Sequence, residues 1–319
     1  MIFLSNVFTD WDLFGASKIS YEQIVELSQT APNLIAWAVP VMLLLTGIEM
    51  WVSHRLEHDH YHKQETVGSI LVGLGSLVIS ALLKFGLIWF TVVLYNLVPW
   101  RMELNWWTLI PCYIIYDLAS YWAHRVSHES RFFWATHVVH HSAEHYNLTV
   151  SYRLSWIQHV KLIFFMPVML LGFHPVIFFV TNQIATLFQF MQHTEYIRRL
   201  HPVLEYIFAT PSNHRVHHGS QEQYIDKNFG ATFIVWDRIL GTYEPEEEQV
   251  IYGITTNIDQ KANPIHINFH EVSEIISDVR QARSPKEAWL YLFGSPITVY
   301  NLKKQAAQRL EPAEERQAA

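Results

Sequence analysis

Residues 117–141 read DLASYWAHRVSHESRFFWATHVVHH, in which an HxxxH motif is followed nine residues later by an HxxHH motif. A single histidine and a second HxxHH motif come further along the chain. The nine histidines of the pattern are His124, His128, His137, His140, His141, His193, His214, His217 and His218. Residues three or four positions apart lie on one face of a helix, so each motif can direct its imidazole rings toward one point. Because imidazole is the commonest nitrogen ligand of zinc, iron and copper, the pattern predicts a metal site.

The number of histidines favours two metal ions. A tetrahedral zinc ion takes four ligands, whereas this pattern offers eight or nine nitrogens. Soluble di-iron proteins combine glutamates with ExxH pairs on a four-helix bundle, and this chain offers imidazoles in place of that pairing. If the bound metal is redox-active iron, its open positions would bind dioxygen. Zinc can substitute in the purified protein, since imidazole sites prefer it to ferrous iron.

The composition is typical of a membrane protein. Half of the 319 residues are hydrophobic, 14% are aromatic and only 16% are charged. Four mostly apolar runs, at 33–52, 70–98, 106–122 and 156–191, are nearly free of charge, which disfavours a large soluble helical core. The fourth run is long enough for a helical hairpin. We therefore expect an all-α, multi-pass integral membrane protein with four to six crossings, in which Lys84 either extends toward the membrane surface or marks a break between two shorter helices.

Basic residues suggest the orientation. If the first crossing runs outside to inside, Arg55 and Lys63 lie on the cytoplasmic side. The third crossing then brings His124 to the same side, together with Arg125 and Arg131. All four histidine groups would thus meet at the cytoplasmic membrane surface, where they form a histidine-rich, two-metal helical cap.

Three regions follow from this pattern. Residues 1–115 would form an N-terminal transmembrane region, and 116–257 a catalytic domain that includes the membrane hairpin at 156–191. Residues 258–319 would form a cytoplasmic segment that ends in a charged tail, which we expect to be disordered after Lys303.

Several function classes are excluded. A net charge of −7 without a basic stripe argues against nucleic acid as a partner. The single cysteine, Cys112, rules out intrachain disulfides and cysteine-ligated clusters. The chain has no HExxH helix, GxSxG elbow, GxGxxG loop or phosphate-binding loop. An oxygenase of this sequence would therefore take its electrons from an external donor.

Three acidic residues are candidates for a catalytic or supporting role. Asp117 precedes His124 by two helical turns, so it is either an acceptor for a ligand histidine or a structural partner of a tyrosine such as Tyr121. Glu129 and Glu144 follow the first two motifs closely. Each either supports a ligand or contacts a cofactor, or is an ordinary solvated residue.

A second group of histidines suggests a rival function. His54, His58, His60 and His62 lie in a polar loop beside apolar runs, as in a metal-binding or metal-transport membrane protein. They lack the HxxHH spacing, and transport needs polar ligands along a path through the bilayer. We therefore favour an ordinary solvated loop.

The motifs together resemble the fatty acid hydroxylase and sterol desaturase superfamily. The resemblance is carried by DLASYWAHRVSHE at 117–129, WATHVVHHSAEHYNLTVSYR at 134–153, FQFMQHTE at 188–195, TPSNHRVHHG at 210–219 and YIDKNFGATFIVWDRILGTYEPE at 224–246. It implies that eight of the nine histidines are the family's ligands and that His193 is its extra ligand. Gln189 stands where some relatives have a further histidine, and Glu129 matches a glutamate associated with activity in the alkylglycerol branch.

The resemblance also implies a reaction. It is closest to the branch that oxidises alkylglycerols, which are ether lipids, with tetrahydrobiopterin as the reductant. The expected activity is that of a membrane-bound di-iron monooxygenase that uses dioxygen and a lipid substrate. Hydroxylation of the carbon next to the ether oxygen would give a hemiacetal that separates into a fatty aldehyde and a glycerol. Hydroxylation or desaturation of a sterol, a fatty acyl chain or a carotenoid is the alternative within the superfamily.

Overall fold

The computed structural model describes residues 15–30 and 32–310, and this part of the chain is helical. Its only strand-like pairing is an isolated bridge between Phe208 and Phe233, so the all-α expectation is confirmed for the described residues. The α-helices are α1 (Tyr21–Thr30), α2 (Leu34–Arg55), α3 (Lys63–Leu97), α4 (Leu109–Glu129), α5 (Arg131–Trp134), α6 (Val138–His141), α7 (Met166–Leu170), α8 (Pro175–Phe190), α9 (Pro202–Ile207), α10 (Pro211–His217), α11 (Val235–Leu240), α12 (Pro264–Gln281), α13 (Pro285–Phe293) and α14 (Pro296–Leu310). The 3-10 helices are η1 (Trp106–Thr108), η2 (Leu148–Tyr152) and η3 (Gln158–Phe165).

Helices α2 and α3 are the two described helices that are long and apolar enough to cross a membrane. The Asn33 side chain caps α2 by accepting a hydrogen bond from the Ala36 amide. Much of their apolar surface is exposed, as at Trp37 (69%) and Leu82 (73%). Exposed apolar surface of this extent is unfavourable in water, and helices of this length can bury it in a lipid bilayer.

Helix α3 runs without interruption through Lys84, so a break at that residue is wrong. The glycines of this helix have a packing role. A Cβ atom on Gly75 would lie 2.4 Å from the Trp156 ring, whose Nε1 donates a hydrogen bond to Val72 O at 3.0 Å. A Cβ atom on Gly73 would lie 3.0 Å from Tyr152. The absent side chains thus let the end of η2 and the segment after it lie directly against α3.

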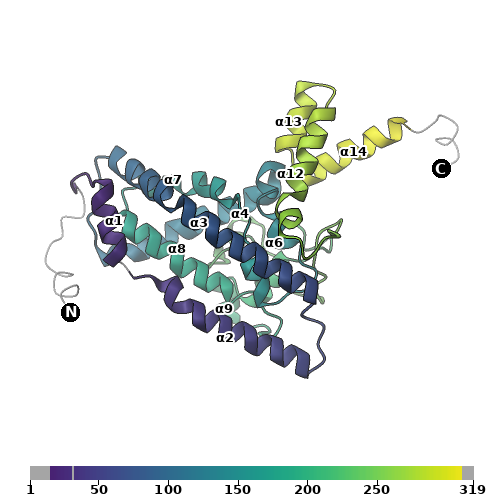
Figure 1. The fold of residues 1–319 in the computed structure, drawn as a ribbon, viewed down its shortest axis with the longest axis horizontal. Helices are drawn as coiled ribbons and strands as arrows, with labels where there is room; N and C mark the ends of the chain where they lie inside the picture. Colours follow the sequence, from purple (N-terminus) through teal and green to yellow (C-terminus); the bar gives the residue numbers. More distant parts are fainter. Residues whose placement is uncertain (1–14, 31, 311–319) are drawn as a thin grey trace.

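The buried centre of the apolar region lies between α4, α7 and α8. Tyr116 of α4 packs against Phe178 of α8 and Phe165 of η3, and Asn182 donates a hydrogen bond to its hydroxyl group at 2.6 Å. Figure 1 shows α2, α3 and α8 running lengthwise through the molecule. Helix α4, which carries the HxxxH motif, is therefore held by the same core that organises the apolar helices.

The expected hairpin turns between Gly172 and His174. Gly172 has a φ of +88°, and His174 caps α8 by accepting a hydrogen bond from the Val176 amide. The first arm differs from an ordinary helix, since η3 is a 3-10 helix that continues into the short helix α7. Neither arm has the 18 residues of a full span.

The C-terminal helices α12, α13 and α14 project beyond the rest of the molecule (Figure 1). Arg131 of α5 attaches this unit by ion pairs with Glu271 and Asp278, both at 2.6 Å. Helix α14 continues to Leu310, so the expectation of disorder directly after Lys303 is wrong for 304–310. The remainder of the expected tail, 311–319, lies outside the described residues.

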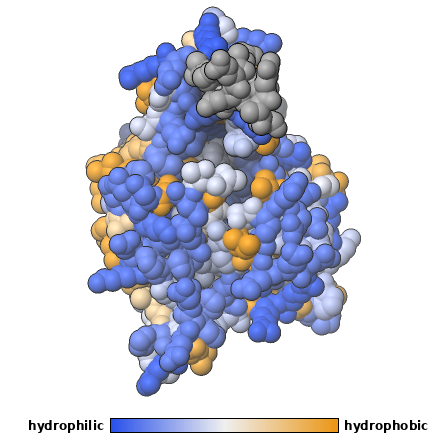
Figure 2. Space-filling model, turned by 90° about the vertical axis from the view of Figure 1, so that its right-hand side faces the viewer, coloured by the Kyte–Doolittle hydropathy of each residue, from blue (hydrophilic) through white to orange (hydrophobic). Residues whose placement is uncertain are grey.

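The end of the molecule that carries the α2–α3 loop is polar. Figure 2 shows this face as mostly hydrophilic, with hydrophobic side chains mainly toward its edges. The long apolar helices extend away from this face (Figure 1). The molecule thus has one polar end and a body with exposed apolar helices.

Candidate metal centre

The nine histidines of the sequence pattern lie in two adjoining clusters. Within each cluster, one ligand atom from every residue lies within 4.8 Å of the others. The five-histidine cluster consists of His124, His128, His137, His141 and His217, and the four-histidine cluster of His140, His193, His214 and His218. His141 of the five-histidine cluster stacks on His218 of the four-histidine cluster, with the ring centroids 4.4 Å apart. The two clusters are therefore direct neighbours. Each cluster offers enough nitrogens for one metal ion.

Each HxxHH motif divides its histidines between the clusters. The pair four positions apart stays together: His137 and His141 lie in one cluster, and His214 and His218 in the other. The middle histidine of each motif, His140 or His217, belongs to the other cluster. The expectation that each motif points at a single centre is therefore correct for HxxxH and wrong for both HxxHH motifs.

Helix α10 carries the second HxxHH motif on a firmly held turn. Thr210 caps the helix by accepting a hydrogen bond from the Asn213 amide, and Pro211 occupies its first position. Arg215 lies between the ligand positions and binds both carboxylate oxygens of Glu246, at 2.6 and 2.7 Å. Its Nη1 also donates to Thr194 O at 3.0 Å, directly after His193. These contacts fix α10 relative to the lone histidine of the four-histidine cluster.

Main-chain carbonyls decide which ring nitrogen faces the cluster centres. The Nδ1 atoms of His124, His193 and His217 lie 2.8, 2.8 and 2.9 Å from the carbonyl oxygens of Phe229, Gln189 and Lys227, respectively. A carbonyl oxygen only accepts hydrogen bonds, so Nδ1 carries the proton in each neutral ring. Their Nε2 atoms are left with a free lone pair directed into the cluster, as a metal ligand requires.

The Nε2 atoms converge closely. In the five-histidine cluster, Nε2 of His141 lies 3.1 Å from Nε2 of His137 and 3.0 Å from that of His217. The Nε2 atoms of His124 and His128 are buried and have no hydrogen-bond partner within the described part of the chain. Convergent imidazole nitrogens, two of them buried without a hydrogen-bond partner, are the donors that a metal ion takes in proteins. The donor set therefore fits a metal ion.

The four-histidine cluster has the same character. Nε2 of His140 lies 3.0 Å from Nε2 of His193 and 3.1 Å from that of His218, and His214 Nε2 lies 3.1 Å from His193 Nε2. Burial lowers the pKa of His193 to about 4. Burial, with the neighbouring rings adding to it, holds the pKa of His217 and His218 well below the usual value of histidine. These imidazoles are thus neutral near pH 7 and available as ligands.

The loop after α10 supplies three of the contacts that orient the histidines. Asp226 Oδ1 lies 3.2 Å from His128 Nδ1, and the next residues include the Lys227 and Phe229 carbonyls. Asn228, with φ +55°, holds the loop by donating from Nδ2 to the carbonyl oxygen of Asn213 at 3.0 Å. Sequence reasoning missed these supporting residues, because two of them act through main-chain atoms that leave no signal in the side-chain pattern.

Asp117 supports this region in a way that the sequence did not predict. Its fully buried carboxylate accepts hydrogen bonds from the amides of Thr232 and Phe233 at 2.8 and 3.1 Å and from Trp236 Nε1 at 2.9 Å. It bonds neither a histidine nor Tyr121, so both of the expected contacts are wrong. Asp117 instead ties the chain just after the supporting loop to α4.

The two glutamates also point away from the clusters. Glu129 is half exposed and pairs with Arg125 at 2.8 Å, one helical turn before it. Glu144 pairs with Lys261 at 2.6 Å. Neither carboxylate hydrogen-bonds a clustered histidine within the described residues, so the expected ligand-supporting contacts are absent. A catalytic or cofactor-binding role for either residue remains a prediction.

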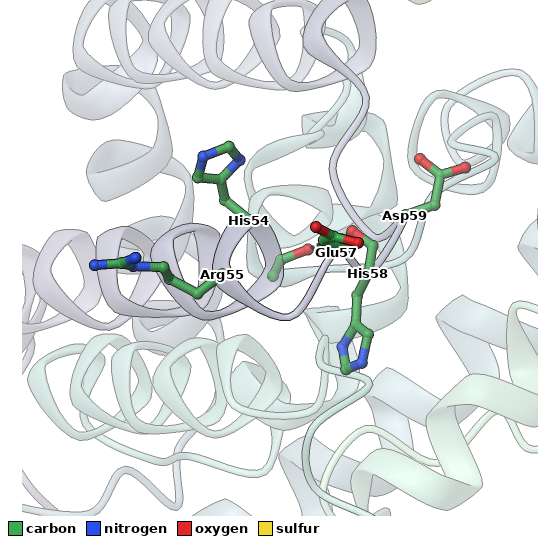
Figure 3. Close-up of a pocket in the computed structure, with 6 residues that line it drawn as sticks. His54, Arg55, Glu57, His58 and Asp59 are labelled. Atoms are coloured by element: carbon green, nitrogen blue, oxygen red, sulfur yellow. Dashed lines mark hydrogen bonds between the residues drawn. The ribbon is translucent and has the colours of Figure 1, made fainter.

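The loop histidines near residue 54 do not form a third cluster among the described residues. Ser53, His54, Arg55, Glu57, His58 and Asp59 line a surface pocket. Figure 3 shows that the rings of His54 and His58 point in opposite directions. The Nδ1 atom of His58 instead lies 3.1 Å from the hydroxyl oxygen of Tyr196. This arrangement favours the ordinary solvated loop over a metal-transport path.

The fold and the site define a class of protein: a helical chain with apolar helices long enough to span a membrane and two adjoining histidine clusters that could bind metal. Residues 109–242 match the model of the fatty acid hydroxylase family, described as "Fatty acid hydroxylase". This match over residues 109–242 confirms the resemblance carried by the histidine motifs.

Known proteins similar to the chain include two animal enzymes. It is 35% identical to the alkylglycerol monooxygenase of Caenorhabditis elegans over 265 residues, which are 80% of this chain and 51% of that protein. It is 36% identical to the human alkylglycerol monooxygenase over 267 residues, 81% of this chain and 58% of that protein. The chain thus spans little more than half the length of these relatives.

A bacterial protein is also similar. The ornithine lipid hydroxylase OlsE of Rhizobium tropici is 29% identical over 149 residues, 46% of this chain and 45% of that protein. No solved structure matches the chain.

Proposed function

We propose that this chain is a membrane-bound lipid monooxygenase with a two-iron centre and that its substrate is an alkylglycerol. The observation that carries the proposal is the convergence of nine imidazoles into two adjoining clusters. The five-histidine cluster would hold one ion and the four-histidine cluster the other. The relatives named alkylglycerol monooxygenase support the choice of substrate.

The chain's own residues would prepare the site for this chemistry. When bound, two iron ions would supply the redox chemistry that activates dioxygen for insertion into a carbon–hydrogen bond. The carbonyls of Gln189, Lys227 and Phe229 keep three rings in the tautomer that binds metal. Burial keeps bulk water away from most of the ligands. Oxidation of the carbon next to the ether oxygen of an alkylglycerol would give a hemiacetal, which separates into a fatty aldehyde and a glycerol.

The proposal includes a membrane topology. Helices α2 and α3 would cross the bilayer, with α4 and the hairpin at 156–191 embedded beside them, as part of a multi-pass protein. The two-metal cap would face the cytoplasm, since Arg55 and Lys63 stand at the adjacent ends of α2 and α3. The polar end face supports a position of this end outside the hydrocarbon core of the bilayer.

The division of the chain is also part of the proposal. Residues 1–115 would anchor the protein, 116–257 would form the catalytic domain and 258–319 would lie in the cytoplasm. An external donor would supply the electrons, and tetrahydrobiopterin is the reductant that the sequence resemblance implies.

The test is a reconstitution of the full chain in detergent or nanodiscs with ferrous iron, dioxygen, tetrahydrobiopterin and an alkylglycerol. We expect a fatty aldehyde to form together with oxygen uptake. A His217→Ala variant should lose both signals, whereas His266→Ala, outside both clusters, should keep them. Two bound metal ions without oxygen uptake on any lipid would overturn the monooxygenase proposal.

A second substrate class is favoured by one observation. The similarity to an ornithine lipid hydroxylase favours hydroxylation of a lipid of another class. The same assay with a panel of membrane lipids separates the two cases. A hydroxylated product from another lipid, without aldehyde from the alkylglycerol, would replace the proposed substrate and keep the reaction class.

A further inference from the structure

Arg153 differs from the other buried arginines of the described chain. Arg131 and Arg215 both form close ion pairs with carboxylates. Arg153 is 0% exposed, and none of the ion pairs among the described residues includes it. Burial lowers its pKa to about 10, so the guanidinium is still charged at neutral pH. The carboxylate of Glu65 opposes this effect without forming an ion pair with Arg153. A buried charge without a directly paired counterion costs folding free energy, so its contacts call for a specific explanation.

The contacts of Arg153 are with the turn that carries the first HxxHH motif. Its Nε donates to Val139 O at 3.0 Å, and its Nη2 donates to Ser142 Oγ at 2.6 Å. Ser142 Oγ in turn donates to Val139 O at 3.1 Å. The three groups form a closed set of hydrogen bonds at the C-terminal end of α6, where a positive charge complements the helix dipole.

Helix α6 needs such support. It has only four residues, and no side chain caps its N-terminal end. A single helical turn is unfavourable on its own because few hydrogen bonds offset the ordering of its backbone. Yet this turn must direct His140 and His141, adjacent in sequence, into different clusters. A small rotation of α6 would move both rings at once.

We propose that Arg153 is the positioning residue that sets the rotation of α6, and so aligns one histidine of each cluster with its metal ion. The guanidinium suits this role because its planar fork binds two acceptors at a fixed angle, which a lysine ammonium does not. The inference rests on the two-metal centre of the proposed function but is independent of the lipid substrate. It predicts that a substitution at Arg153 weakens both metal sites together.

The test uses the full chain in detergent, stripped of metal and titrated with Co²⁺ against a competing chelator. The wild type should bind two ions. In Arg153→Lys, which keeps the charge and loses the fork, we expect the affinity of both sites to fall by about 10- to 100-fold, the usual cost of losing a group that orients metal ligands. The Co²⁺ absorption bands should change as well, because the ligand geometry changes.

Arg131→Lys is the matched control. Arg131 is also a buried arginine near the first motif, but its partners are Glu271 and Asp278 of the C-terminal unit. This variant should lower the melting temperature of the metal-free protein and leave the Co²⁺ affinities within about twofold of the wild type.

The outcomes separate the possibilities. Unchanged affinities and bands in Arg153→Lys would overturn the role of Arg153. If that variant does not fold, Ser142→Ala removes one acceptor of the same set and should weaken both sites in the same direction; no effect there would also overturn the role. Fewer than two ions bound by the wild type would instead overturn the two-metal centre, and this role with it.

Discussion

His140 and His141 are neighbours in the sequence, yet their Nε2 atoms face different clusters. His140 Nε2 lies 3.1 Å from that of His218, and His141 Nε2 lies 3.0 Å from that of His217. Two adjacent residues on a helical turn point about 100° apart, so one turn can serve two centres. The two candidate metal sites are therefore mechanically coupled through α6.

This relationship predicts unequal effects of removing the two rings. His140→Ala leaves three histidines in its cluster, whereas His141→Ala leaves four in the other. We expect His140→Ala to bind about one metal ion per chain where the wild type binds about two, and His141→Ala to keep two with one of them weakened. Metal content after dialysis measures the difference. His159→Ala, outside both clusters, is the control, and equal losses in the two cluster variants would contradict the assignment.

The buried histidines predict acid sensitivity of the metal-free protein. Because their pKa values lie below the unfolded value of about 6.5, the unfolded chain binds more protons than the folded chain once the pH falls below that value. Stability is therefore full above about pH 6.5 and falls as the pH decreases toward 4, where His193 titrates. Each such histidine contributes about 1.4 kcal/mol per pH unit within its window.

Thermal unfolding of the metal-free protein between pH 7.5 and about 4.5 measures this dependence. His193→Asn removes one of the buried titrating rings and should give a shallower slope. A melting temperature that stays flat below pH 6.5 would rule out neutral, buried imidazoles.

Asp117 is expected to be a stability determinant. In Asp117→Asn, the amide nitrogen would replace one of the oxygens that now accept from the amides of Thr232 and Phe233 and from Trp236 Nε1. The new amide N–H group would then face another N–H donor without an acceptor in a buried site. We expect this to lower the free energy of unfolding by about 1–3 kcal/mol. Chemical denaturation in detergent measures the change. Ser120→Ala, one turn away, loses only a bond to Tyr116 O and should change stability much less.

Asp226 emerged as a supporting residue only from the structure, whereas Glu129 was predicted from the sequence, so variants of the two residues test one assignment against the other. Asp226 contacts His128 although its side chain is 52% exposed, whereas Glu129 pairs with Arg125 and hydrogen-bonds none of the clustered histidines. Asp226→Ala should therefore weaken the five-histidine site by about 10-fold, and Glu129→Ala should leave metal affinity nearly unchanged. Competitive Co²⁺ titration measures both. A stronger effect of Glu129→Ala would favour the role that the sequence resemblance implies for that residue.

Much of the helical framework could be predicted because its signals are local. The apolar runs at 33–52 and 70–98 correspond to α2 and α3, since hydropathy alone requires such segments to be helical and apolar along their length. The 3-10 geometry of η3 and the continuity of α3 through Lys84 could not be read in this way. Both depend on packing, as in the approach of Trp156 to Gly75.

The sequence by itself determined which histidines would gather, because eight of the nine recur in HxxxH and HxxHH motifs that a metal site explains well, and the family resemblance added His193. Tertiary structure alone decided how they divide, since His140 and His217 each leave their motif partners for the opposite cluster. It also decided what supports them. Asp117 accepts hydrogen bonds from Thr232 and Phe233, which lie 115 and 116 positions away in the sequence. The Phe229 carbonyl beside His124 Nδ1 is 105 positions from that histidine. Such contacts depend on how separate segments pack, and no local pattern of side chains encodes them.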